Sequence, residues 1–316
     1  MKIAVLDWNT MTMNGDISLS ELEKLGEVTI FGLTKPEDAA ENIGDAEAVI
    51  CNKVPITREV IDRCPQLRYI GLFATGYNNI DVNYAAEKEI TVCNAGQYST
   101  SAVAQQVFAY ILDHYNRINE YNSAVLRGEW EHSDVFSYFP VPTRELAGKN
   151  LSIVGFGSIG RAAAKIGEAF GMNIIVSTRT LPQDCKYELT DIQTAAEKAD
   201  ILTFHCPLTD RTKGLVNKEL LSVMKPSAVL INTARGGIVI EKDLAEALNS
   251  GKIAAAYLDV LDKEPMSPET PLKGAKNCII TPHTAWAALE TRERLLTIVC
   301  ENLRAWLAGK PQNKIN

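Results

Sequence analysis

Three polar residues of this 316-residue chain each follow a short apolar segment that is typical of a buried strand: Arg235, Glu264 and His283. A guanidinium can hold a carboxylate through two parallel hydrogen bonds. An imidazole can donate a proton near neutral pH, and an adjacent carboxylate orients it and favours its charged form. The set therefore fits the reduction of a 2-oxo acid. Arg235 would hold the carboxylate and polarise the oxo group, His283 would protonate the oxo oxygen, and Glu264 would support His283.

Spacing alone leaves structural roles open for each of the three, such as a turn cap, a solvated carboxylate or a structural histidine. A stronger signal lies between residues 151 and 180, where an apolar run leads into a glycine-rich turn, a helical pattern and a second apolar run. This order of strand, turn, helix and strand is what a dinucleotide-binding fingerprint requires. The expected cofactor-binding residues of the turn are Gly155, Phe156, Gly157, Ser158, Ile159 and Gly160.

The three glycines have different roles in such a turn. Gly155 allows the sharp change of direction, Gly157 lets the backbone approach a pyrophosphate, and Gly160 lets helix and strand pack closely. The unpaired N–H groups and the positive end of the helix dipole then bind the anion. A purely structural glycine turn is the alternative.

The composition limits the possible classes of protein. The chain is 46% hydrophobic and 22% charged, and its length suits two domains. A net charge of −7 without a basic cluster argues against a nucleic-acid partner. The seven cysteines have neither paired nor metal-ligand spacing, so we expect no metal site and a reducing, cytoplasmic compartment. We expect neither a signal peptide nor a membrane span, because residues 1–7 become charged early and no apolar run is long enough.

The rest of the chain alternates strand-like and helical patterns, which predicts α/β architecture with doubly wound parallel sheets. A long helix over residues 99–117 would lead into a second domain, and a helix over 289–307 would return to the first. We therefore expect two Rossmann-like or flavodoxin-like domains with a cleft between them, the second with a sheet of about six strands.

Two stretches of the first hundred residues are candidates for substrate binding. Lys53 follows the third predicted strand, and residues 71–76 end the fourth strand in small residues whose N–H groups could meet a carboxylate. An ordinary surface lysine and an ordinary turn are the alternatives.

An aromatic segment, Glu120 to Pro142, follows the long helix and shows poor periodicity. It contains Trp130, Phe136 and Phe139. We interpret it as an irregular arm that is buried at the interface of a homodimer, the alternative being that it caps its own domain.

Six blocks of sequence, spread in order over nearly the whole chain, resemble the D-isomer-specific 2-hydroxyacid dehydrogenases. The blocks are FATGYNNID at 73–81, VGFGSIGRAAAKIGEAFGM at 154–172, HCPLTDRTKGLVN at 205–217, MKPSAVLINTARGG at 224–237, LDVLDKEP at 258–265 and ITPHTAW at 280–286. The resemblance implies hydride transfer between a nicotinamide cofactor and a small 2-oxo or D-2-hydroxy acid. Hydroxypyruvate or glyoxylate, reduced to D-glycerate or glycolate, is the expected substrate.

The resemblance also implies domains of residues 1–98 with 288–316 for the substrate and 99–287 for the dinucleotide. It implies that Arg235, Glu264 and His283 are catalytic. The implied substrate contacts are Arg235, His283, Lys53, Ala74, Thr75 and Gly76. Asp259 and Thr233 would contact the nicotinamide carboxamide. The other implied cofactor contacts are Val103, Thr178, Arg179, His205, Cys206, Pro207, Thr212, Ala234 and Ala285.

The chain departs from the family pattern at two positions. Gln105 stands where many relatives have Glu, a change that we do not interpret, and Thr178 stands where relatives that use NAD have Asp. With Arg179 beside it, this favours NADP(H), with NAD(H) as the alternative. A different class of function, a nucleotide-sensing binding protein on a dehydrogenase fold, is a rival that the intact Arg, Glu and His argue against.

Overall fold

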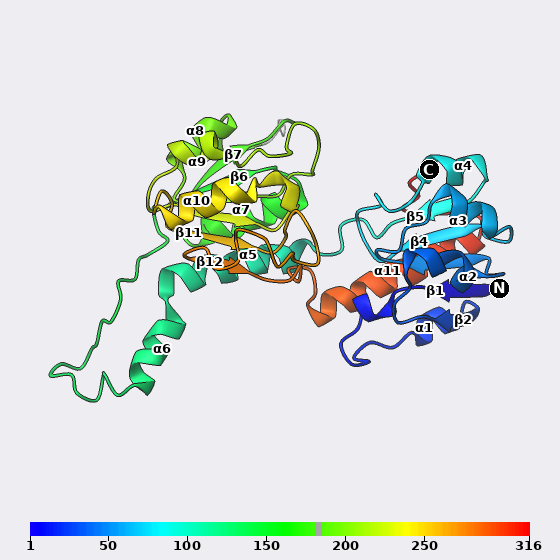
Figure 1. Cartoon of the computed structure of the whole chain (residues 1–316), viewed down its shortest axis with the longest axis horizontal. Coiled ribbons are helices and arrows are strands. Elements are labelled where there is room, and N and C mark those ends of the chain that lie inside the picture. The colour runs from blue at the N-terminus through cyan, green and yellow to red at the C-terminus, as the bar shows by residue number, and fades with distance from the viewer. Residues whose placement is uncertain (181–184) are drawn as a thin grey trace. The chain divides into compact units, whose positions relative to one another are not determined.

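The computed structural model describes residues 1–180 and 185–316 and divides into two compact units (Figure 1). The first unit comprises Met1–Ser99 and Ala287–Asn316, and the second comprises Thr100–Trp286. Each contains one parallel sheet with helices on both faces, which confirms the predicted fold class.

The sheet of the first unit has the strand order β2-β1-β3-β4-β5. This is the flavodoxin-like order, in which ligands bind beyond the carboxyl ends of the strands. The strands are β1 (Lys2–Val5), β2 (Glu27–Ile30), β3 (Ala48–Cys51), β4 (Tyr69–Leu72) and β5 (Thr91–Cys93). Because β3 and β4 are buried on both faces, they are continuous apolar runs without alternation.

Helices cover both faces of this first sheet. One face packs against α2 (Ala39–Ile43), α3 (Arg58–Arg63) and α4 (Val82–Glu87). The other meets α11 (Leu289–Leu307), which contacts both β4 and α1 (Ser20–Glu23). Two short 3-10 helices, η1 (Trp8–Thr10) and η2 (Pro36–Asp38), complete the unit. None of the helices within residues 1–180 and 185–316 is long and apolar enough to cross a membrane.

The sheet of the second unit has the order β12-β11-β10-β9-β6-β7-β8, the Rossmann order with its reversal between β6 and β9. The strands are β6 (Asn150–Val154), β7 (Asn173–Ser177), β8 (Glu188–Leu189), β9 (Ile201–Phe204), β10 (Val229–Asn232), β11 (Ala255–Leu258) and β12 (Cys278–Ile280). The seven strands in the described residues exceed the predicted six by the two-residue edge strand β8, which is too short to leave a periodic signal.

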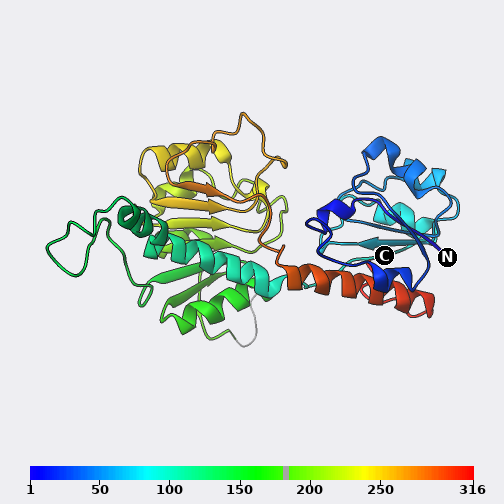
Figure 2. The same cartoon turned by 90° about the horizontal axis from the view of Figure 1, so that it is seen from below.

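Two layers of helices enclose this second sheet (Figure 2). On one face, α5 (Thr100–Asn116) and α7 (Ser158–Ala169) pack against β6, β7, β9, β10 and β11. On the other lie α8 (Ile192–Lys198), α9 (Lys218–Val223) and α10 (Glu241–Asn249). The 3-10 helix η3 (Gly236–Ile238) follows β10. Both cores therefore hold the carboxyl ends of the central strands in fixed positions.

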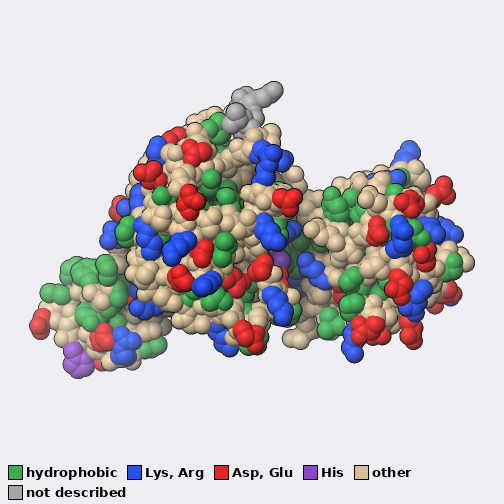
Figure 3. Space-filling model, turned by 45° about the horizontal axis from the view of Figure 1, so that its top comes forward, with side chains coloured by type: hydrophobic (Ala, Val, Ile, Leu, Met, Phe, Trp, Pro, Cys, Tyr) green, Lys and Arg blue, Asp and Glu red, His purple; other side chains and the backbone are tan. Residues whose placement is uncertain are grey.

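Residues 118–142 project from the second unit as an arm (Figure 1). The prediction of an irregular segment from Glu120 onward was wrong for its first part, because α6 spans Ile118–Leu126. Only Ala124 of this helix is buried. Since the helix has no core-facing apolar stripe, its periodicity is not visible in the sequence. Figure 3 shows hydrophobic side chains gathered on this projecting part of the surface, at the left of the view.

Candidate active site

The glycine-rich turn connects β6 to α7 at the reversal of the strand order. Gly155 has a φ of 92°, and a Cβ on it would lie 2.6 Å from the backbone nitrogen of Cys206. A Cβ on Gly160 would lie 2.3 Å from the carbonyl oxygen of Gly155. These two glycines are therefore required by close backbone packing.

Gly157 differs from the other two glycines, because a Cβ on it would meet no atom of the described residues within 4 Å. It is also the N-cap of α7 and brings no side-chain acceptor to the first-turn N–H groups, which begin at Ser158 and Ile159. An open backbone surface beside free donors fits a pyrophosphate. The residues present therefore suit the phosphate part of a dinucleotide.

Two buried polar atoms lie at the carboxyl ends of the neighbouring strands β9 and β10. His205 Nδ1 and Thr233 Oγ1 have no hydrogen-bond partner among the residues that the structure describes. Burial lowers the pKa of His205 to about 4, so its ring is neutral at pH 7. The sequence predicts cofactor contacts for both residues, and a carboxamide offers the donor and acceptor that such unsatisfied atoms need.

The loop after β9 carries further predicted cofactor contacts. The Thr212 hydroxyl donates to the Pro207 carbonyl oxygen at 2.6 Å and accepts from Thr209 N at 2.8 Å, which closes the loop. Thr212 thus braces the loop. Cys206 directly precedes Pro207, and burial raises the pKa of its thiol. The remaining predicted contacts lie on separate elements. Val103 is buried on α5, Phe156 is buried after β6, Ala234 follows β10 and Ala285 follows β12.

The carboxyl end of β7 carries Thr178, Arg179 and Thr180. The Thr178 side chain is half-buried and donates to the carbonyl oxygen of Thr180 at 3.4 Å, whereas Arg179 is exposed. In a Rossmann sheet this strand end faces the ribose of the adenosine half.

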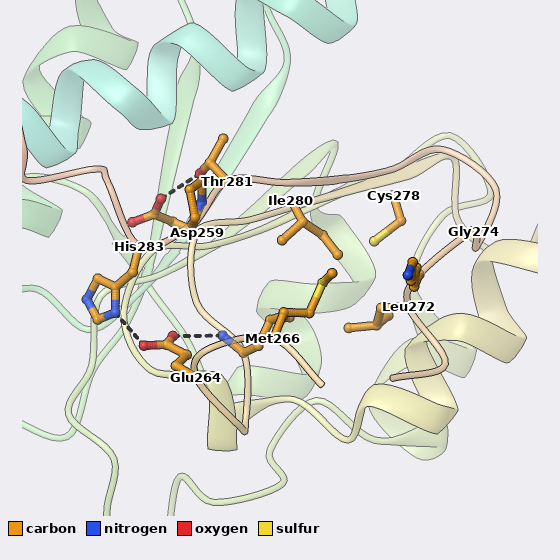
Figure 4. A pocket seen from close by; sticks show the side chains of 12 residues that line it. Asp259, Glu264, Met266, Leu272, Gly274, Cys278, Ile280, Thr281 and His283 are labelled. Atoms are coloured by element: carbon orange, nitrogen blue, oxygen red, sulfur yellow. Dashed lines mark hydrogen bonds and ion pairs between the residues drawn. The ribbon is translucent and has the colours of Figure 1, made fainter. Parts of the chain in front are cut away.

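His283 and Glu264 form a hydrogen-bonded pair beyond β11 and β12 (Figure 4). His283 Nδ1 lies 2.6 Å from Glu264 Oε2, and Glu264 Oε1 accepts from Leu261 N at 3.0 Å. The two side chains are 31% and 35% exposed. Because Nδ1 is engaged by Glu264, Nε2 is the ring nitrogen available to a substrate.

The turn that carries His283 is held by Asp259, which is 2% exposed. His283 has a φ of 55° and donates its N–H to the Asp259 carbonyl oxygen at 2.8 Å. The Asp259 carboxylate accepts from Thr281 Oγ1 at 2.5 Å, Thr284 N at 2.9 Å and Ala285 N at 2.8 Å. Its side chain therefore orders the turn, while its predicted contact with the nicotinamide carboxamide stays a prediction.

Arg235 follows β10 with an exposed side chain, and its Nη1 donates to the Ala234 carbonyl oxygen at 2.7 Å. Its loop is braced by Asn232, whose Nδ2 donates to the Arg235 carbonyl oxygen at 2.9 Å while its Oδ1 accepts from Ala234 N at 3.0 Å. The sequence analysis did not identify Asn232. The available signal was a polar residue that ends an otherwise apolar strand.

A close backbone contact joins the Arg235 loop to the Glu264 loop. A Cβ on Gly236 would lie 1.8 Å from the Leu261 carbonyl carbon and 2.4 Å from Asp262 N. Arg235, Glu264 and His283 thus come from the carboxyl ends of three neighbouring strands, and two of their loops are in direct contact.

A cavity of about 390 Å³ borders the His283–Glu264 pair (Figure 4). Its wall is mainly apolar and includes Leu261, Met266 and Ile280. This wall limits solvent on one side of the His283–Glu264 pair.

The predicted substrate contacts of the first unit lie at the carboxyl ends of β3 and β4. Lys53 follows β3, and its backbone N–H donates to Asp7 Oδ2 at 2.7 Å. The Asp7 carboxylate is buried and also accepts from Asn52 N and Val54 N. Burial raises the pKa of Asp7, and the N–H donors oppose that shift. The sequence analysis did not identify Asp7, a charged residue directly after an apolar strand.

The loop of Ala74, Thr75 and Gly76 is braced by the segment that follows β5. Asn94 Nδ2 donates to the Thr75 carbonyl oxygen at 2.7 Å, the Thr75 hydroxyl donates to the Gly96 carbonyl oxygen, and Ala95 N donates to the Ala74 carbonyl oxygen. The loop therefore presents an ordered backbone at this edge of the sheet.

The second unit is a Rossmann sheet with an open glycine-rich turn where the strand order reverses. A histidine–carboxylate pair lies beyond its strands. Together these features define a nicotinamide-dependent oxidoreductase. Residues 108–285 match the family model for the NAD-binding domain of D-isomer specific 2-hydroxyacid dehydrogenases. The chain belongs to the D-isomer specific 2-hydroxyacid dehydrogenase family and is an oxidoreductase.

Individual relatives agree with this assignment. The chain is 41% identical to hydroxypyruvate reductase of Blautia hydrogenotrophica over 100% of both proteins. It is 38% identical to glycerate dehydrogenase of Methylorubrum extorquens over 89% of this chain and 88% of that protein. Among solved structures, it resembles an NADPH-dependent glyoxylate/hydroxypyruvate reductase of Sinorhizobium meliloti in complex with NADP and malonate. The identity is 30%, the TM-score is 0.83, and 99% of this chain and 96% of that one are covered.

Proposed function

We propose that this enzyme reduces hydroxypyruvate and glyoxylate to D-glycerate and glycolate. The observation that carries the proposal is the 2.6 Å pair of His283 Nδ1 and Glu264 Oε2, which leaves Nε2 to donate a proton to the oxo oxygen. Arg235 holds the carboxylate bidentately and polarises the oxo group. The bound coenzyme supplies the hydride to the oxo carbon, so the oxo acid gains one hydride and one proton. The names of relatives support the choice of substrate.

A panel of oxo acids tests this function. Glyoxylate, hydroxypyruvate, pyruvate and longer 2-oxo acids are compared by kcat/KM with both reduced coenzymes. We expect hydroxypyruvate or glyoxylate to give the highest value. No turnover with any of them would favour the nucleotide-sensing alternative.

We further propose that the two units bind different molecules. Residues 1–98 and 288–316 would bind the substrate, and residues 99–287 would bind the dinucleotide. Lys53 and the backbone of Ala74, Thr75 and Gly76 would meet the substrate carboxylate, since they end neighbouring strands of the first sheet. We place the protein in the cytoplasm, because its seven cysteines are free thiols.

NADP(H) is the proposed coenzyme, because Thr178 replaces the carboxylate that would repel a 2′-phosphate and Arg179 offers a cation beside it. A charge-assisted phosphate contact contributes about 1.5 to 3 kcal/mol. We therefore expect wild type to prefer NADPH and Thr178→Asp to shift the kcat/KM ratio toward NADH. The ratio is measured at one salt concentration.

Thr143→Asp is the matched control, because it adds the same charge on an exposed residue of the segment that precedes β6. It should leave the coenzyme ratio unchanged. A wild-type preference for NADH would contradict the coenzyme assignment. An unchanged ratio in Thr178→Asp would show that the end of β7 does not set it.

The arm supports a homodimer. Leu126, Phe136 and Phe139 are 78%, 92% and 79% exposed, which is an unusual apolar surface for one segment. Burying it against a second copy would remove it from water. We expect sedimentation to give a dimer at micromolar concentration, and we expect Phe136→Ser with Phe139→Ser to weaken it. Leu33→Ser, at an exposed apolar residue of the first unit, is the control. A monomeric wild type would contradict the dimer.

A further inference from the structure

A part-buried hydrogen-bond chain runs from α5 to the turn that carries His283, and its direction is fixed. Thr281 Oγ1 donates its single proton to Asp259 Oδ1 at 2.5 Å. The Thr281 hydroxyl also pairs with the Tyr110 hydroxyl, which must therefore be the donor to it. Tyr110 is 4% exposed on α5, and burial raises its pKa, so it is protonated and able to donate.

The hydrogen-bond chain ends at backbone N–H groups next to His283. The Asp259 carboxylate that accepts from Thr281 also accepts from Thr284 N and Ala285 N, which directly follow the histidine. His283 itself has a φ of 55°, a conformation that costs a non-glycine residue on the order of 1–2 kcal/mol. Since such a conformation persists only where its surroundings impose it, these bonds restrain the turn.

We propose that Tyr110 and Thr281 are positioning residues that aim His283 for proton transfer, acting through Asp259. This inference rests on the proposed role of His283 as proton donor. Without the Thr281 hydroxyl, Asp259 Oδ1 loses one of its two donors, and Tyr110 loses its acceptor. The turn then relaxes toward ordinary backbone angles, and the ring moves away from its 2.6 Å contact with Glu264.

Thr281→Val and Thr281→Ser separate positioning from packing, because Val keeps the shape and Ser keeps the hydroxyl. We expect Thr281→Val to lower kcat with the preferred oxo acid about 10- to 100-fold with little change in KM, as for a misaimed catalytic group. Thr281→Ser should restore most of kcat. Equal activity of the Val and Ser variants would overturn the proposal.

Tyr110→Phe and Tyr257→Phe form a matched pair. The two rings contact each other with centroids 5.2 Å apart, and Tyr257 is 3% exposed and donates to Asp113 Oδ2 at 2.8 Å rather than to Thr281. Tyr110→Phe loses the part-buried hydrogen bonds of its hydroxyl to Thr281 and Gln106, and Tyr257→Phe loses the part-buried hydrogen bond to Asp113. We expect only Tyr110→Phe to lower kcat, by at least about 5-fold. Equal losses in both variants would show a general effect of stability and overturn the proposal.

A spectroscopic measurement tests positioning without turnover. The chain has four histidines, so labelled imidazole signals are few and His283→Gln assigns one of them. We expect Thr281→Val to move the His283 signal, while the signal of the exposed His132 stays unchanged. An unmoved His283 signal would overturn the proposal. Full activity of His283→Gln would instead contradict the proposed function, whatever the positions of these signals.

Discussion

Arg235→Lys is expected to lower kcat/KM for the preferred oxo acid by roughly two to four orders of magnitude. This corresponds to a loss of about 3 to 5 kcal/mol in transition-state stabilisation. Lysine keeps the charge but cannot form two parallel hydrogen bonds to a carboxylate. Each bond to a charged group contributes about 1.5 to 3 kcal/mol, and the polarisation of the oxo group is weakened as well. The measurement is steady-state reduction at saturating coenzyme.

Coenzyme binding serves as the internal control for Arg235→Lys. Arg235 itself is not among the predicted coenzyme contacts and lysine keeps its positive charge, so the coenzyme dissociation constant from calorimetry should stay close to that of wild type. If the lysine variant kept kcat/KM within about 5-fold of wild type, bidentate binding by Arg235 would be the wrong role.

Gly236→Ala is expected to damage the site through the backbone. The added Cβ would overlap the peptide bond between Leu261 and Asp262, at 1.8 Å from the carbonyl carbon. Because the obstacle is backbone rather than a flexible side-chain end, the loops of Arg235 and Glu264 must separate. We expect a loss of about 3 kcal/mol in the free energy of unfolding and a fall in kcat/KM of more than about 100-fold.

Gly237→Ala is the matched control at the next position. A Cβ there would come within 3.1 Å of Leu208 Cδ2, the end of a 44% exposed side chain that can move aside. Thermal unfolding and kcat/KM should therefore change little. Similar losses in both variants would show that the short helix η3, rather than the contact with Leu261, requires glycine.

The sequence predicted the fold well because both sheets are built from buried parallel strands. Such strands are continuous apolar runs, and helical patterns between them mark the crossovers. The long helices α5 and α11 were also predicted, since each has a wide buried face. The edge strand β8 and the helix α6 were not predicted, because neither has a core-facing pattern.

The placement of Arg235, Glu264 and His283 at one edge of the sheet was predictable from the sequence, but the hydrogen bonds that support their loops were not. Arg235, Glu264 and His283 stand after strands, and parallel strands bring their ends to one edge. By contrast, Thr281 and Asn232 act through hydrogen bonds whose partners depend on loop conformation. Such contacts leave no periodic pattern in the sequence from which they could be predicted. The close approach of Gly236 to Leu261 could not be predicted either, because a glycine in the sequence does not indicate which residue packs against it.

With His283 as the proposed proton donor, its left-handed backbone conformation places thermal stability and activity in conflict at this position. Glycine would adopt a φ of 55° at lower cost than histidine, but it has no side chain that could transfer a proton. A selection for melting temperature alone would therefore enrich inactive substitutions here. Efforts to stabilise this enzyme should keep residue 283 fixed and look for gains on the surface of α10 or α8 instead.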